Sequence, residues 1–149
     1  MYRSILGAVD GSQYSAKAVK HAALLAKMSG AKLILFHAAP HVHMPPYTEG
    51  LDVDGVQKIE DLAKSTRDAQ ARKVLADARK GLGFSDLGVE ESFVVSSNPY
   101  EAILETAKNR DCDLIVMAPH GHHGIAGILL GSETQKVLTH SKIPVLVVR

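Results

Sequence analysis

Residues 113–132 read Asp113-Leu-Ile-Val-Met-Ala118-Pro-His-Gly121-His-His-Gly124-Ile-Ala-Gly127-Ile-Leu-Leu-Gly131-Ser132. A short apolar run is followed by a loop of small residues, glycines and histidines, and the loop ends in Gly-Ser at an expected helix start. This order predicts a strand, a loop and a helix. Glycine lets a ligand approach the backbone closely, and a helix N-terminus offers unpaired N–H groups and the positive end of the helix dipole. The segment therefore indicates an anion-binding loop, with a simple tight connection as the alternative.

The loop differs from two familiar phosphate-binding sequences. No Gly-Lys-Ser/Thr closes it, and its glycines do not have the G-x-G-x-x-G spacing of dinucleotide-binding folds. A phosphate site in this loop would therefore be of another kind.

The composition excludes several classes of function. The chain has 149 residues, a net charge of +1 and a single cysteine, Cys112, so an internal disulfide and a multi-cysteine metal site are excluded. Mixed charges and only four Tyr, three Phe and no Trp give no sign of a nucleic-acid surface. No apolar run has the length of a membrane helix and the N-terminus lacks the features of a secretory signal. We therefore expect one cytoplasmic domain, residues 1–149, that contacts neither nucleic acid nor membrane.

Strand-like and helix-like segments alternate along the chain. Apolar runs predict strands at 4–9, 32–37, 89–95, 113–117 and 145–148, and amphipathic or capped segments predict helices at 12–30, 56–80, 98–110 and 132–140. Residues 39–55 contain three prolines and two histidines, so we interpret them as a functional lid or a disordered loop. The alternation predicts an α/β fold in which helices cover both faces of a mainly parallel sheet.

Two loops of this fold attract attention. Ligands of such sheets bind beyond the carboxyl ends of the strands, at the point where the strand order reverses. The turn Asp10-Gly11-Ser12 follows the first strand, and residues 118–132 follow the fourth. If the first and fourth strands are neighbours, the two loops face one crevice.

These segments resemble the universal stress protein family. Residues 1–12 resemble its first strand and acidic turn, residues 113–121 its fourth strand, and residues 129–132 with 143–148 its last helix and strand. The similarity covers essentially the whole chain, and only about residues 40–56 are unanchored. The resemblance implies a Rossmann-like three-layer sandwich with a five-stranded parallel sheet in the order 3-2-1-4-5.

The ATP-binding branch of that family has a glycine motif, Gly, two residues, Gly, nine residues, Gly, then Ser or Thr. Here Gly121 is the second glycine, residues 122–130 are the nine, and Gly131 with Ser132 closes the motif. Ala118 occupies the first glycine position, and the following proline lacks a backbone donor. Pairing Gly121 with the glycine three residues later would leave only six residues before Gly131, so we prefer the register with Ala118.

The resemblance implies ATP, with Mg²⁺, as the ligand. The acidic residue near the adenosine corresponds to Asp10, the adenine-contacting backbone to Ala38, and the phosphate loop to Gly121, Gly131 and Ser132 with the Glu133 amide. Ala118 and Pro119 border the ribose. The candidate ATP-binding residues are Asp10, Gly11, Ala38, Ala118, His120, Gly121, His122, Gly131, Ser132 and Glu133.

Other interpretations of these residues stay open. Asp10 is also typical of a turn that caps the first helix. Residues 132–135, Ser-Glu-Thr-Gln, form a capping box in which the Ser132 hydroxyl is held by the helix itself. His122 and His123 are interpreted as lying near phosphates or as solvated loop residues. We expect no metal site, because neighbouring loop histidines rarely converge without carboxylate or cysteine partners.

The leading hypothesis is an ATP-binding universal stress protein, a regulatory homodimer whose nucleotide occupancy alters its shape or its partners in a stress response. The apolar segment Val145–Val148 is expected to form the dimer interface, and an unidentified protein partner is compatible with this function. One alternative is a nucleotide-free dimerisation and interaction module of the same fold, which Ala118 and Pro119 favour. Another is a weak ATPase, although neither a nucleophile elbow nor P-loop machinery is present.

Overall fold

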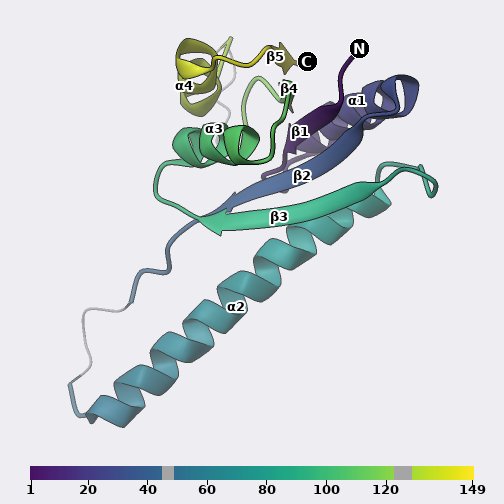
Figure 1. Cartoon of the computed structure of the whole chain (residues 1–149). Coiled ribbons are helices and arrows are strands. Elements are labelled where there is room, and N and C mark those ends of the chain that lie inside the picture. The colour runs from purple at the N-terminus through teal and green to yellow at the C-terminus, as the bar shows by residue number, and fades with distance from the viewer. Residues whose placement is uncertain (45–48, 123–128) are drawn as a thin grey trace.

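The computed structural model describes residues 1–44, 49–122 and 129–149. The described part contains a five-stranded sheet and four helices (Figure 1). In chain order they are β1 (Ser4–Ala8), α1 (Gln13–Ser29), β2 (Lys32–Ala39), α2 (Val53–Lys80), β3 (Val89–Val95), α3 (Pro99–Asn109), β4 (Leu114–Met117), α4 (Ser132–His140) and β5 (Val145–Val147). All neighbouring strands are parallel, in the order β3-β2-β1-β4-β5. The predicted α/β fold, its parallel sheet and its strand order are confirmed.

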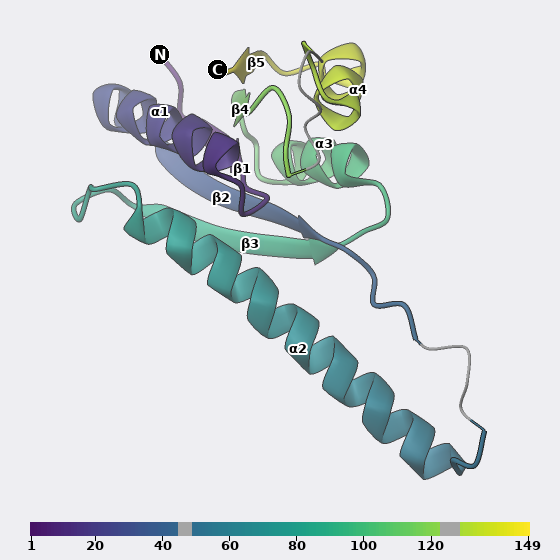
Figure 2. The same ribbon diagram turned by 180° about the vertical axis from the view of Figure 1, so that it is seen from behind.

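The sheet is covered on both faces. In Figure 2, α1 and α2 lie in front of the strands, and α3 and α4 belong to the other layer. Alternate residues of β2 separate the two cores, because Leu33 and Leu35 pack toward α1 and α2, whereas Ile34 and Phe36 pack toward α3 and α4. All four side chains are at most 1% exposed. The near-continuous apolar runs of the central strands follow from this two-sided burial.

Two elements are longer than the sequence pattern predicts. Helix α2 begins at Val53, not at residue 56, because the Asp52 carboxylate caps it by accepting a hydrogen bond from the Gly55 N–H at 2.8 Å. Strand β2 continues to Ala39, because it pairs with β3 as far as Val95. The first turns of α2 extend well beyond the sheet (Figure 1).

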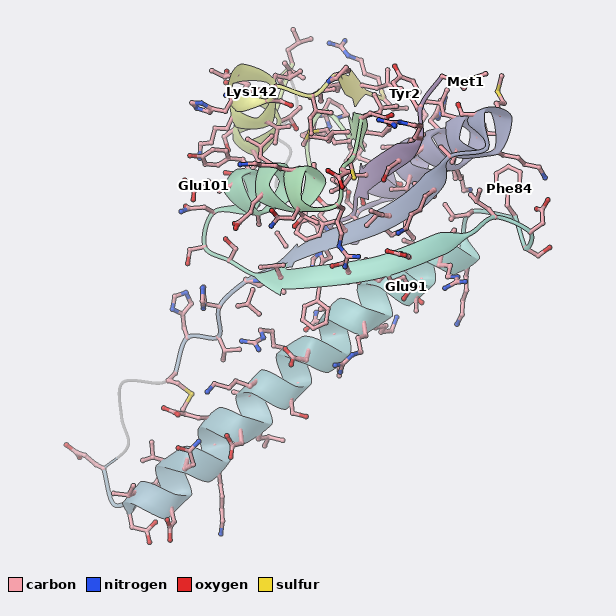
Figure 3. The ribbon with its side chains drawn as sticks, viewed as in Figure 1. Met1, Tyr2, Phe84, Glu91, Glu101 and Lys142 are labelled. Atoms are coloured by element: carbon pink, nitrogen blue, oxygen red, sulfur yellow. The ribbon has the colours of Figure 1, made fainter. Side chains whose placement is uncertain are left out.

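The two edge strands differ in charge. On β3, Glu90 pairs with Lys32 at 2.6 Å, and Glu91, labelled in Figure 3, pairs with Arg79 of α2 at 3.3 Å. On β5 the residues are valine, leucine and valine, and Leu146 is 38% exposed. Charged side chains protect an edge strand from pairing with another chain, and β5 has none.

Cys112 is a structural residue, as its flanking aspartates suggest. It is 6% exposed, and its Sγ lies 3.5 Å from the Ser4 hydroxyl. Burial raises the pKa of the thiol, and the charge of Asp113 raises it further. In the described ranges, no helix is both long enough and apolar enough to cross a bilayer.

Gly7 of β1 allows α1 to pack closely on the sheet, since a Cβ at this position would lie 3.1 Å from Cγ1 of Val19. We predict that Gly7→Val lowers the free energy of unfolding by about 1–3 kcal/mol, the usual cost of overpacking a core, as measured by urea denaturation. Gly88→Val is the control, because a Cβ at Gly88 meets nothing within 4 Å. Equal unfolding midpoints for the two variants would contradict this close packing.

Candidate functional site

Two cavities open at the carboxyl ends of the strands, where β1 and β4 are neighbours and the strand order reverses. The first, called here the α4-side cavity, has a volume of about 800 Å³ and lies between the ends of β1, β2 and β4 and the start of α4. It is lined by all ten predicted site residues except Gly11. Gly11 lines the second, the α2-side cavity, which has a volume of about 1050 Å³. The two predicted loops therefore do face one crevice.

Asp10 lies at the entrance to both cavities. Its Oδ1 accepts a hydrogen bond from the Ser12 N–H at 2.9 Å, and the left-handed Gly11 (φ 84°) turns the chain away from β1. The cap of α1 is Ser12, whose hydroxyl accepts from the Ser15 N–H at 3.1 Å. Asp10 therefore shapes the turn without capping the helix.

The Asp10 carboxylate is charged at neutral pH. Burial raises its pKa, but the hydrogen bonds from Ser12 and Ser15 and the nearby His122 outweigh this effect. The pKa consequently lies below the ordinary aspartate value. Its Oδ2 accepts no backbone N–H from a described residue, so this half-buried carboxylate is a suitable acceptor for ligand hydroxyl groups.

Gly121 is required by space, because a Cβ at this position would overlap Oδ2 of Asp10. Gly131 is also crowded: its N–H donates to the Pro119 carbonyl at 2.6 Å, and a Cβ there would lie 3.3 Å from the same oxygen and from His120. The two glycines of the predicted motif thus bring the start and end of the loop together. Neither has a positive φ.

The two departures from the motif are compatible with this geometry. Asp111 is the sole non-glycine residue with a positive φ in the described part of the chain, so Ala118 has an ordinary backbone conformation. The Ala118 carbonyl accepts a buried hydrogen bond from the Thr134 hydroxyl at 3.0 Å. Pro119 takes part through its carbonyl, so its missing N–H does not weaken the loop closure.

The predicted capping box at the start of α4 is wrong. Gly131 is the N-cap (φ −68°, ψ 156°), its carbonyl accepts the Gln135 N–H at 3.0 Å, and Ser132 is the first helical residue. The packing of Gly131 against His120 leaves little room for a side chain at the cap position. No hydrogen bond joins the Ser132 hydroxyl to another described residue, and the N-terminus of α4 faces the α4-side cavity without a side-chain cap.

Glu133 has a role that the sequence pattern does not reveal. Its Oε2 accepts a hydrogen bond from the Tyr100 N–H at 2.9 Å, and its Oε1 accepts from Lys136 at 3.0 Å. Asn98, the N-cap residue of α3, makes no side-chain cap hydrogen bond. The carboxylate of α4 therefore satisfies a first-turn N–H of α3 and is directed away from its own helix terminus.

Three histidines surround the α4-side cavity. The His120 ring contacts Tyr14 edge-on, with 4.6 Å between ring centroids, and its buried Nδ1 has no hydrogen-bond partner among the described residues. His122 lies over Gly11. His37, which the sequence interpretation did not select, places its Nδ1 2.8 Å from the Val9 carbonyl. The sequence feature that could have identified His37 is its position at the carboxyl end of a predicted inner strand.

His123, Pro45 and Pro46, which the lid and phosphate interpretations invoke, lie outside the described residues. Across residues 1–44, 49–122 and 129–149, no three His, Cys, Asp or Glu side chains are grouped in a way that would hold a metal ion.

The fold agrees with a comparison against known families. The model of the universal stress protein family matches residues 1–149. The chain belongs to this family.

Similar proteins cover the whole chain. A universal stress protein of Thermus aquaticus, from the 3' region of a QAH/OAS sulfhydrylase, is 34% identical over 149 residues, which is 100% of both chains. The solved structure of MJ0577, which is from Methanocaldococcus jannaschii, has a TM-score of 0.79 at 28% identity and covers 99% of this chain and 96% of its own. A universal stress protein solved in complex with cAMP has a TM-score of 0.70 at 31% identity, with 99% and 97% covered.

The bond between Glu133 and the start of α3 gives a prediction. Glu133→Ala should lower the free energy of unfolding by about 1 kcal/mol, because it leaves a first-turn N–H without its cap. Lys136→Ala is the control, since it removes the surface ion pair and an exposed cation–π contact with Tyr100 but leaves the cap, so it should cost less than Glu133→Ala. Both values come from chemical denaturation. Equal effects of the two variants would mean that the cap contributes nothing.

Proposed function

We propose that this universal stress protein binds ATP, with Mg²⁺, in the α4-side cavity, and that it acts as a nucleotide-dependent regulatory homodimer in a stress response. The observation that carries the proposal is the uncapped N-terminus of α4, which faces a cavity that also contains the Asp10 carboxylate and the free backbone edge of β2. These features are complementary to the phosphates, the ribose and the adenine.

The phosphates are assigned to the first turn of α4. The N–H groups of Ser132, Glu133 and Thr134 belong to this turn and have no intrahelical acceptors. The Glu133 carboxylate accepts from the Tyr100 N–H of α3, so it does not cap the N–H groups of its own helix. Phosphate groups are the usual ligands of such a terminus. Mg²⁺ would arrive with the nucleotide, since phosphates and water are its usual ligands in nucleotide sites.

The adenine is assigned to the backbone of Ala38. Backbone groups of successive strand residues point alternately to the two neighbouring strands. The Phe36 carbonyl accepts from Val9 on the β1 side, and the Ala39 carbonyl accepts from Ser96 on the β3 side. The N–H and C=O of Ala38 therefore point toward β1, which has ended by this level. Neither group is hydrogen-bonded to a described residue. Such an N–H and C=O match N1, an acceptor, and the N6 amino group, a donor, of adenine.

The position of Asp10 and the volume of the cavity are compatible with a nucleotide. Asp10 lies between these two regions and is available to ribose hydroxyls, and a volume of about 800 Å³ is within the usual range for small-molecule sites. A relative was solved with cAMP, and a universal stress protein from Archaeoglobus fulgidus, 20% identical and with a TM-score of 0.65, was solved with dAMP. Both are adenine nucleotides, which supports the choice of base.

Ser132→Ala tests the phosphate assignment. The hydroxyl makes no hydrogen bond to a described residue, so its removal should change the free energy of unfolding by less than about 0.5 kcal/mol. ATP affinity, titrated by calorimetry with Mg²⁺ into protein stripped of nucleotide, should fall by about threefold to tenfold. Nucleotide released from freshly purified wild-type protein by heat, identified by chromatography, is the companion measurement.

Two results would reject this assignment. Unchanged ATP affinity in Ser132→Ala would reject a contact between the Ser132 hydroxyl and the phosphates, because both proteins keep the same backbone N–H groups. Wild-type protein that neither releases nor binds a nucleotide would favour the alternative of a nucleotide-free interaction module.

The homodimer is proposed to form through β5. This edge strand is apolar and uncharged, whereas β3 at the opposite edge carries paired glutamates. The Val148 N–H donates to the Met117 carbonyl, and the Pro144 carbonyl accepts from the Ile115 N–H. The backbone groups of even-numbered residues therefore point toward β4. Those of Val145 and Val147 point outward. Pairing with the same strand of a second copy would satisfy these groups in a two-fold symmetric interface.

Val147→Pro should convert the dimer to a monomer, because proline removes one outward N–H without removing a hydrogen bond to β4. Val95→Pro is the matched control. The Ser96 N–H donates to Ala39 of β2, and because backbone groups alternate along a strand, the Val95 N–H points outward from the β3 edge. Molar mass is measured by light scattering after size exclusion. Dimers that persist in Val147→Pro, or monomers in the Val95→Pro control alone, would exclude β5 as the interface.

A further inference from the structure

The pairing between β1 and β2 ends beside His37: the last paired residues are Ala8 and Phe36, and the Val9 N–H donates to the Phe36 carbonyl. A parallel ladder that continued by one step would have the Ala38 N–H donate to the Val9 carbonyl. No such bond is present among the described residues. The Val9 carbonyl is instead 2.8 Å from Nδ1 of His37, whose ring lies at the boundary between the two cavities.

The chemistry of this contact fixes the tautomer of the ring. A carbonyl oxygen can only accept a hydrogen bond, so Nδ1 of His37 carries the hydrogen and donates it. In the neutral imidazole, Nε2 is then a lone-pair acceptor. The form with hydrogen on Nε2, which free histidine favours, cannot make this bond.

We propose that His37 is a positioning residue for nucleotide selection: by donating Nδ1–H to Val9, it keeps the backbone edge of Ala38 open for an adenine. This inference rests on the proposed ATP function and adds the source of its base specificity. Without a side-chain donor at position 37, the Val9 carbonyl is free to accept the Ala38 N–H, and the ladder closes over the edge that the base requires. The backbone N–H and C=O of Ala38 select the base. His37 affects these groups indirectly, by occupying the Val9 carbonyl.

The substitutions follow from the geometry. His37→Leu removes the donor by replacing the imidazole with an apolar side chain of similar size. His37→Asn is the conservative variant, because its amide Nδ2 replaces the histidine Nδ1 as the donor to Val9. ATP and inosine triphosphate are the paired ligands, since they share ribose and phosphates but inosine reverses the donor and acceptor at positions 1 and 6 of the base.

We expect wild-type protein to prefer ATP over inosine triphosphate by about tenfold or more, the value of one good hydrogen bond or more. His37→Leu should reduce this preference to about twofold or less, and His37→Asn should retain most of it. A merely structural role of His37 would weaken both ligands equally and leave their ratio unchanged. Nitrogen-15 NMR of the wild-type imidazole should show hydrogen on Nδ1 at neutral pH.

The outcomes separate this inference from the function on which it rests. If wild-type protein binds ATP and His37→Leu keeps the full preference for ATP, the inference is overturned and the proposed function stands. An imidazole with hydrogen on Nε2 and none on Nδ1 in the NMR spectrum overturns it as well. If wild-type protein binds neither triphosphate, the proposed function is overturned together with the inference.

Discussion

The burial of the central strands on both faces is the constraint on which the structure depends. β1, β2 and β4 lie between two helical layers, and their inward residues are almost fully buried. Polar groups cannot lie along such strands without large desolvation costs, so they gather where the strands end. Because all strands are parallel, their carboxyl ends lie at one edge of the sheet, and the reversal of strand order at β1 and β4 opens a space there. The position of the site is therefore a consequence of the core.

Close packing at this edge brings the described beginning and end of the glycine motif together. Gly121 is fitted against Asp10, and Gly131 is bonded to Pro119 and packed on His120. The requirement for glycine is steric at both positions, which explains why an alanine is accommodated at 118, where the backbone is ordinary. A spacing rule based only on glycine would treat the three positions alike, whereas the structure shows that they differ in what surrounds them.

The fold could be predicted from the sequence because strand and helix patterns are local and the order of the strands follows from the family resemblance. Nine of the ten predicted residues also line one cavity, since loops after neighbouring parallel strands must meet. The capping box failed because the cap of α4 is set by a contact between Gly131 and His120, which no local pattern contains. The roles of Glu133 and His37 were missed for the same reason. Each depends on a partner in another element, Tyr100 and Val9 respectively.

Helix α4 joins the proposed site to the proposed interface. Its first turn lines the cavity, and residues beyond its last turn lead directly into β5, which pairs with β4. The helix is fastened to α3 through Glu133 and to the end of β4 through Thr134. A ligand shifts a conformational equilibrium only by its difference in affinity for the two states. If ATP alters the β5 edge through α4, the contacts that hold this helix must therefore differ between the empty and the occupied protein, and these two hydrogen bonds are the first to compare.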